Sequence, residues 1–147
     1  MPIQSVTKAV NHSASLMFDL VSDIREYPKF VPACKEIIVA NTSIENKKNI
    51  IIARMTVGIG LIKEDFTSKV ILDRKNKIIL VNNYDGLFKN LNNAWSFKDK
   101  DGGCIVNFTI DFELMDTPIS PIITLMFSKV FNKYVSAFEK RANELYF

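Results

Sequence analysis

Residues 104–114 carry the pattern that most narrows the fold of this chain. Apolar side chains occupy every even position from 104 to 114, and Asn, Thr, Asp and Glu hold four of the odd positions between them. Because successive side chains of a strand point to opposite faces, this alternation predicts a strand with one buried and one solvated face. Such strands are typical of antiparallel sheets that pack one face against a core.

The remaining sequence divides into shorter strands and two helices. Further strands are predicted at residues 3–10, 37–40, 50–57, 61–72, 78–84 and 91–97. Apolar residues recur at helical spacing over 16–24, and the chain after Pro121 forms one long helix. Short connections favour an antiparallel meander over parallel crossovers. The order predicts a single α+β domain over residues 1–147, with a curved antiparallel sheet of about six or seven strands around the C-terminal helix.

Composition restricts the class of partner. Hydrophobic residues make up 48% of the chain, and the net charge is only +3, from 19 basic and 16 acidic residues. This charge is too small and too evenly spread to indicate a DNA-binding surface. Cys34 and Cys104 lack metal-ligand spacing and are expected to be buried free thiols. No secretion signal is visible and no apolar run approaches about 18 residues, so a cytoplasmic protein is expected.

The segment 21–34, called the proline elbow below, interrupts the first helix. Pro28 has no amide proton, and Pro32 disfavours a helical conformation in the residue before it. The helix should therefore end near residue 27, and the elbow should present Tyr27, Phe30 and Val31. Such a stiff apolar segment either forms the lip of a pocket for an apolar molecule or covers one end of the core.

The C-terminal helix has more apolar surface than one sheet can cover. Its second half is apolar on one side, as expected for a helix packed on a core. Its first half, residues 119–131, is apolar on nearly all sides and must face a loop, a ligand, a membrane or a partner. The candidate ligand contacts on this helix are Met126, Val130, Phe131 and Tyr134.

Few polar side chains suit catalysis. His12, the only histidine, lies in a predicted capping turn. Glu64 falls in the apolar phase of its strand, where a carboxylate is costly unless it is paired. It either pairs with Arg54 on the preceding strand or helps to polarise a ligand carbonyl. Asn82 and Tyr84 share the apolar phase of their strand, where they either supply hydrogen bonds to a ligand or are hydrogen-bonded at the end of the strand.

Four blocks of sequence, the last at residues 137–142 near the end of the long helix, resemble a known family. Residues 23–34 resemble the Asp-Val-x-x-Tyr-Pro-x-Phe-x-Pro-Trp-Cys motif of the coenzyme Q-binding START-like family, which includes bacterial ribosome association toxins. Residues 63–66 and 85–97 are similar to its Lys-Glu-Ser-Phe and Gly-Pro-Phe-x-x-Leu…Trp-x-Phe blocks. The resemblance implies a helix-grip fold with a tunnel between sheet and helix, whose mouth is lined by Tyr27, Pro28, Phe30, Val31, Pro32, Leu87 and Phe88. Ala33 and Leu87 depart from the family's usual Trp and Pro.

The resemblance leaves three functions open. The tunnel would hold ubiquinone or a similar isoprenoid lipid, which a transient contact with the inner membrane would load; the quinone is then a ligand, and no cofactor is required. Alternatively, the protein would bind the large ribosomal subunit and block subunit association through a basic face. Lys29, Lys35, Lys47 and Lys48 are the candidates for that face. The third possibility is a cyclase or dehydratase, in which Glu64 would act almost alone.

Overall fold

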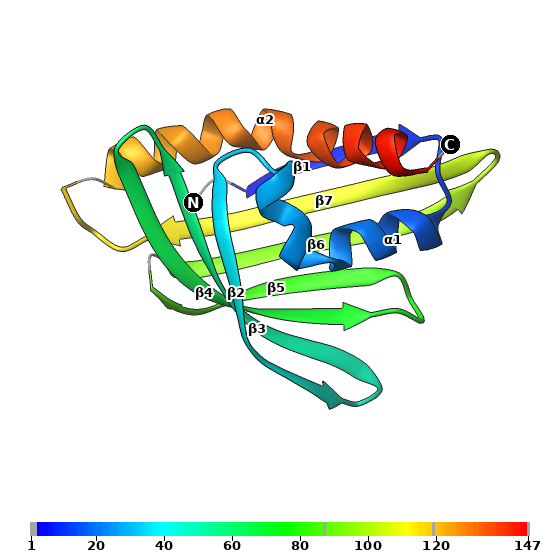
Figure 1. Cartoon of the computed structure of the whole chain (residues 1–147), viewed down its shortest axis with the longest axis horizontal. Helices are drawn as coiled ribbons and strands as arrows, with labels where there is room; N and C mark the ends of the chain where they lie inside the picture. The colour runs from blue at the N-terminus through cyan, green and yellow to red at the C-terminus, as the bar shows by residue number, and fades with distance from the viewer. Residues whose placement is uncertain (1–2, 87, 119, 147) are drawn as a thin grey trace.

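The computed structural model describes residues 3–86, 88–118 and 120–146, and it contains seven strands, two α-helices and a 3-10 helix (Figure 1). The chain order is β1 (Ile3–Val10), α1 (Ala14–Ser22), η1 (Ile24–Lys29), β2 (Cys34–Glu45), β3 (Lys48–Ile59), β4 (Ile62–Asp73), β5 (Ile78–Gly86), β6 (Phe88–Lys100), β7 (Gly103–Leu114) and α2 (Ser120–Leu145).

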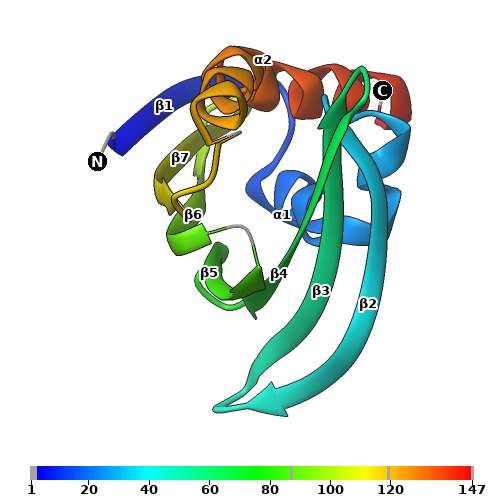
Figure 2. The same ribbon diagram turned by 90° about the vertical axis from the view of Figure 1, so that its left-hand side faces the viewer.

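All seven strands form one antiparallel sheet in the order β1-β7-β6-β5-β4-β3-β2. The first strand pairs with the last, so the meander from β2 to β7 is closed at one edge by β1. Figure 2 shows the sheet bent into a trough, with α2 across its open side. This is the predicted α+β helix-grip arrangement. No helix within the described residues is long and apolar enough to cross a membrane.

Local sequence explains most of the boundaries. The alternation in β7 is confirmed, since its even positions are buried except for half-buried Ile110. Gly60 and Gly102 adopt positive φ angles of 61° and 78° in the turns before β4 and β7, a conformation that glycine adopts readily. Ser13 caps α1 by accepting a hydrogen bond from the amide of Leu16 at 3.2 Å.

Two boundaries differ from the sequence prediction. The first helix stops at Ser22, and the chain continues as the 3-10 helix η1, which tolerates Pro28 near its end. Strand β2 runs to Glu45 rather than ending near residue 40. Its polar second half is exposed and pairs with the first residues of β3, so backbone pairing persists where side-chain burial ends.

The core is centred on Phe138, which is fully buried on α2. Its ring centroid lies 5.0 Å from that of Trp95 on β6 and 5.3 Å from that of Tyr134 one turn earlier. It also contacts the proline elbow, with centroids 5.2 Å from Tyr27 and 5.1 Å from Phe30. One side chain therefore joins the sheet, the long helix and the elbow.

We expect Phe138→Ala to lower the free energy of unfolding by about 3–5 kcal/mol, because it removes a large buried ring and leaves a void. Leu61→Ala is the control: Leu61 is fully exposed, and the change should stay within about 0.5 kcal/mol. Urea titration followed by circular dichroism measures both. Equal effects of the two substitutions would contradict the central role of Phe138.

Candidate functional site

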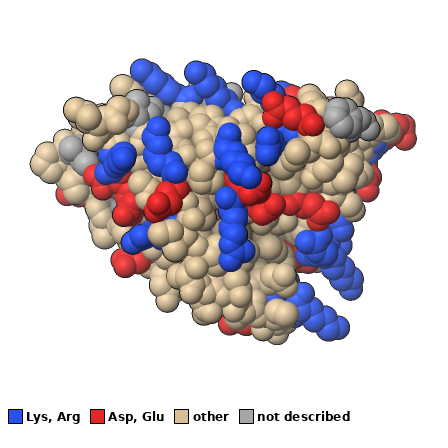
Figure 3. Space-filling view, in the orientation of Figure 1, with Lys and Arg blue, Asp and Glu red and all other residues tan. Residues whose placement is uncertain are grey.

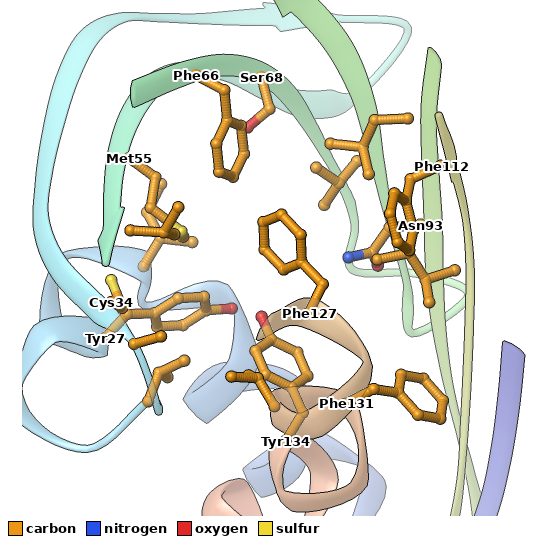
Figure 4. A pocket seen from close by; sticks show the side chains of 18 of the residues that line it. Tyr27, Cys34, Met55, Phe66, Ser68, Asn93, Phe112, Phe127, Phe131 and Tyr134 are labelled. Carbon is orange, nitrogen blue, oxygen red and sulfur yellow. The ribbon is translucent and has the colours of Figure 1, made fainter. Parts of the chain in front are cut away.

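A cavity of about 120 Å³ lies between α2 and the inner face of the sheet (Figure 4). Its walls come from η1, the residues that follow η1, strands β1–β7, and α2 from Phe127 to Tyr134. It separates two hydrophobic clusters. The larger surrounds Phe138, and the smaller contains Phe66, Phe88, Phe112 and Ile123. The aromatic rings of the smaller cluster also line the cavity.

The structure brings most of the sequence-predicted ligand residues to this cavity. The lining includes Tyr27, Val31, Pro32, Phe88, Val130, Phe131 and Tyr134. Leu87 and the side chain of Met126 lie outside the described residues. Phe30 and Glu64 are not part of the lining that the structure describes.

Phe30 packs on the core side of the elbow. Its ring lies against Phe138, and the guanidinium carbon of Arg141 is 5.5 Å from its centroid. Tyr27 and Val31, on either side of it, reach the cavity. Both interpretations of the elbow therefore apply: Tyr27 and Val31 line the pocket, and Phe30 covers the core.

The proposed pair between Glu64 and Arg54 is wrong. Directly opposed residues of antiparallel strands share a face, and Glu64 is opposite Val57, whereas Arg54 is opposite Thr67. Glu64 shares the inner phase of Phe66 on β4, while Arg54 is exposed on the outer phase of β3. The two side chains therefore lie on opposite faces of the sheet.

The assignment of Asn82 and Tyr84 to the inner phase is also wrong. On β5 the inward residues are Ile79 and Val81, of which Ile79 is buried and both line the cavity. Tyr84 is exposed and belongs to the outer phase. Residues 78–81 are all apolar, so the sequence does not show which alternate positions of this strand face the core.

The polar side chains that do reach the cavity are uncharged. They are Gln4, Ser68, Asn93 and Tyr134, with Tyr27 and Cys34 at the elbow side. Asn93 was missed in the sequence, although its position between Leu91 and Trp95 places it in the buried phase of β6. No Asp, Glu, Lys, Arg or His occurs in the lining given by the described residues. Such a surface suits a neutral, mostly apolar molecule.

Burial sets the protonation of these groups. It raises the pKa of Tyr134 and of Tyr27, so both hydroxyls stay protonated at neutral pH. The Tyr27 hydroxyl donates a hydrogen bond to the carbonyl oxygen of Val21. Burial also raises the pKa of the Cys34 thiol to about 11.

The outer surface divides into apolar and basic parts. Exposed apolar side chains occur near the start of α2, at Met115, Ile122 and Leu125, and at Leu61 in the β3–β4 turn. Figure 1 places that turn and the start of α2 at the same end of the molecule. Farther along α2, Lys129, Lys133 and Lys140 are exposed at helical spacing. Figure 3 shows basic side chains along this edge of the molecule, over α2.

The four lysines expected to form a basic face do not gather. Lys29 and Lys35 lie near the start of β2, and Lys47 and Lys48 lie at its far end, roughly 40 Å away along a strand of this length. Lys29 pairs with Glu26 at 2.8 Å, and Lys48 lies 3.8 Å from Asp73. The length of β2 therefore separates Lys29 and Lys35 from Lys47 and Lys48, and the four lysines form no single basic face.

Cys34 and Cys104 offer a test of access to the cavity. Both thiols are buried with a pKa near 11, but only Cys34 is in the described lining. We expect an apolar maleimide to modify Cys34 faster than Cys104, with a rate that rises about tenfold per pH unit from 7 to 10, because the thiolate is the reactive form. Mass spectrometry of Cys34→Ala and Cys104→Ala variants measures each thiol separately. Equal rates at the two sites would exclude an accessible cavity.

Comparison with known proteins gives two similar relatives. The chain is 33% identical over 147 residues to the ribosome association toxin RatA of Escherichia coli K12, a match that covers 99% of this chain and 90% of RatA. It is 28% identical to the mitochondrial coenzyme Q-binding protein COQ10 homolog B of Xenopus laevis, over 97% of this chain and 58% of that protein.

A solved structure supports the same relationship at the level of the fold. A START superfamily protein from Mycobacterium smegmatis superposes with a TM-score of 0.77 at 20% identity, covering 97% of this chain and 98% of that one. The model of the polyketide cyclase / dehydrase and lipid transport family matches residues 10–139. That match spans most of the chain, including the cavity walls from η1 to α2, and the chain therefore belongs to the polyketide cyclase / dehydrase and lipid transport family.

Proposed function

We propose that this protein binds a neutral isoprenoid lipid with a ring-shaped head group, most simply ubiquinone, and carries it without chemical change. The observation that carries the proposal is the cavity, whose described walls are apolar and aromatic with a few uncharged polar groups. The name of the COQ10 relative agrees with a quinone ligand. General acid-base catalysis needs a group that titrates near the working pH, whereas burial raises the pKa values of the cavity's tyrosines and Cys34.

The size of the cavity favours a head group over a whole lipid. An engineered protein cavity of about 150 Å³ accommodates benzene, so a space of about 120 Å³ is at most the size of one unsubstituted ring, and the substituted ring of ubiquinone would have to widen it. The tail of an isoprenoid quinone would need further apolar surface. The cavity continues toward Phe88, Phe112 and Phe127, whose ring centroids lie within 6.0 Å of one another. These rings offer the start of a path for the tail.

The exposed apolar side chains at this end fit a lipid surface as the source of the ligand. Leu61, Ile122 and Leu125 are exposed where the β3–β4 turn and α2 begin to cover the cavity. Lys129 and Lys133 follow on the outer face of α2, where they would meet anionic head groups. We infer that a transient contact of this end with the inner membrane loads and releases the ligand.

Filling the cavity should remove the ligand. We expect Ala53→Phe to lower the amount of ubiquinone that co-purifies from a quinone-producing host by at least about tenfold, because Ala53 is buried in the cavity wall on β3. Ala40→Phe makes the same change at an exposed position of β2 and should retain the ligand. Mass spectrometry of organic extracts measures both. A wild-type protein that purifies without any quinone, or with phospholipid alone, would contradict the proposal.

Ribosome association is the second candidate, because RatA from Escherichia coli matches nearly the whole chain. The lysines of α2 offer a more compact basic surface than the four lysines along β2. Lys129 and Lys133 are one turn apart and exposed, and no ion pair to either occurs among the described residues. Such a surface can neutralise phosphates of ribosomal RNA.

If this candidate is right, the protein should co-sediment with large ribosomal subunits, and the binding should weaken as salt rises. The double substitution Lys129→Glu and Lys133→Glu should weaken it by at least about tenfold. Lys47→Glu with Lys75→Glu makes the same charge change at exposed sites away from α2 and is the control. Co-sedimentation that neither pair changes would remove α2 from the interface.

A further inference from the structure

We propose that Asn93 and Tyr134 form a two-point hydrogen-bonding site for the oxygens of the ligand's head group, and that this site selects oxygenated rings from other apolar molecules. The inference rests on the proposed function and assigns the residues that determine its specificity. Its basis is that both side chains reach the cavity with hydrogen-bonding capacity that the described residues leave unused.

Asn93 has a buried oxygen with no partner. Its inward position between Leu91 and Trp95 carries the amide into the cavity wall, where Oδ1 is enclosed and accepts no hydrogen bond from the described residues. Buried polar atoms without a partner are rare in native proteins. Figure 4 shows the amide nitrogen of Asn93 toward the central space, so Oδ1 would face a ligand after the amide turns. A half-turn of the amide exchanges its donor and acceptor ends, so the group can serve either role.

The ring of Tyr134 is held firmly by its aromatic neighbours. The ring centroid lies 5.3 Å from Phe108, 5.8 Å from Trp95 and 5.3 Å from Phe138, which fixes the side chain against β6 and β7. No described residue bonds its hydroxyl, in contrast to Tyr27, whose hydroxyl is committed to the carbonyl of Val21. Figure 4 shows the Tyr134 hydroxyl and the Asn93 amide directed toward the same central space.

The packing of Tyr134 brings the two groups to the same part of the cavity. Asn93 and Trp95 are inward neighbours on β6, two residues and therefore roughly 7 Å apart. Tyr134 packs on Trp95 from α2, so its hydroxyl and the Asn93 amide reach this part of the cavity from the helix side and from the sheet side. The ring of Phe127 projects into the space between the polar groups and offers an aromatic face for stacking (Figure 4).

The chemistry defines the ligand class. Both groups can donate to a carbonyl and accept from a hydroxyl, so a quinone and its reduced quinol are both satisfied. Neither group is charged, and the described lining provides no cation. A carboxylate or phosphate head group would therefore lose its hydration without compensation. The site favours neutral oxygenated rings over fatty acids and phospholipids.

The test compares decylubiquinone with decylbenzene, which has a tail of the same length but no oxygen. Trp95, the only tryptophan of the chain, lines the cavity, so its fluorescence quenching by the quinone gives one dissociation constant. Competition of decylbenzene against the bound quinone gives the dissociation constant of decylbenzene. We expect the wild-type protein to prefer decylubiquinone.

The substitutions Asn93→Leu and Tyr134→Phe should each weaken quinone binding by roughly 3- to 10-fold, the value of one neutral hydrogen bond, and leave decylbenzene binding within about twofold. Two controls match these changes. Asn92→Leu alters an exposed neighbour on the outer face of β6, and Tyr84→Phe removes a hydroxyl at an exposed position of β5 outside the described lining. Neither control should change the preference for the quinone.

Infrared spectroscopy of the bound quinone measures the frequency of its carbonyl stretch, which reports hydrogen bonding to the carbonyl and does not depend on how much of the protein is folded. The carbonyl stretch should lie at lower frequency in the wild-type complex and rise in Tyr134→Phe or Asn93→Leu. If the wild-type protein binds the quinone and both variants retain its affinity and carbonyl frequency, the two-point site is wrong while the proposed function stands. If the wild-type protein binds neither ligand, both inferences fail.

Discussion

The contact between the aromatic row of α2 and strands β6 and β7 sets the position of everything else. Phe131, Tyr134 and Phe138 point toward the sheet from successive turns, and they meet Trp95 and Phe108 with ring centroids 5.0–5.8 Å apart. Large rings hold the helix axis away from the sheet, while their mutual packing fixes its rotation. The C-terminal half of α2 is therefore anchored, and the cavity lies beside its first half.

This arrangement explains why a cavity remains in a well-packed protein. One straight helix cannot fill a strongly bent sheet along its whole length. The elbow and α1 complete the core around Phe138, but no second helix covers the sheet beside the first turns of α2 (Figure 2). The smaller cluster around Phe88 and Phe112 lies at the other end. The space between the two clusters is a consequence of the same packing that stabilises the fold.

Sequence patterns were sufficient where one face of an element is apolar and the other is polar. The alternation in β7 and the stripe on α2 gave the correct elements and the correct inner faces. The prediction failed where that contrast is absent: residues 78–81 of β5 are apolar in both phases, so Asn82 and Tyr84 were placed on the wrong face. The predicted pair of Glu64 and Arg54 failed for a different reason. Only the register between β3 and β4 shows that the two side chains lie on opposite faces of the sheet.

The site itself was only partly visible in the sequence. The elbow and α2 supplied six of the predicted lining residues, because both segments carry more apolar side chains than a core requires, and the family resemblance supplied Phe88. Asn93 was overlooked because a single polar residue among aromatic neighbours is easily taken for an irregularity. Yet its alternation with Leu91 and Trp95 already placed it inside, and an inward amide within an apolar row is a signal that recurs wherever a cavity must recognise oxygen.

Ligand retention and ribosome contact use different faces of the same helix. Val130 and Tyr134 face the cavity, whereas Lys129 and Lys133 are exposed one position before each of them. A ligand that fills the cavity contacts the inner face of α2 without covering its outer face, so ligand retention and ribosome contact do not compete for side chains, whereas membrane contact and ribosome contact would both use Lys129 and Lys133. Substitutions on the inner face should therefore reduce ligand retention without removing the lysines that ribosome contact would use. Any coupling between ligand retention and ribosome contact would have to pass through a shift of α2 as a whole, which the packing of Phe138 resists.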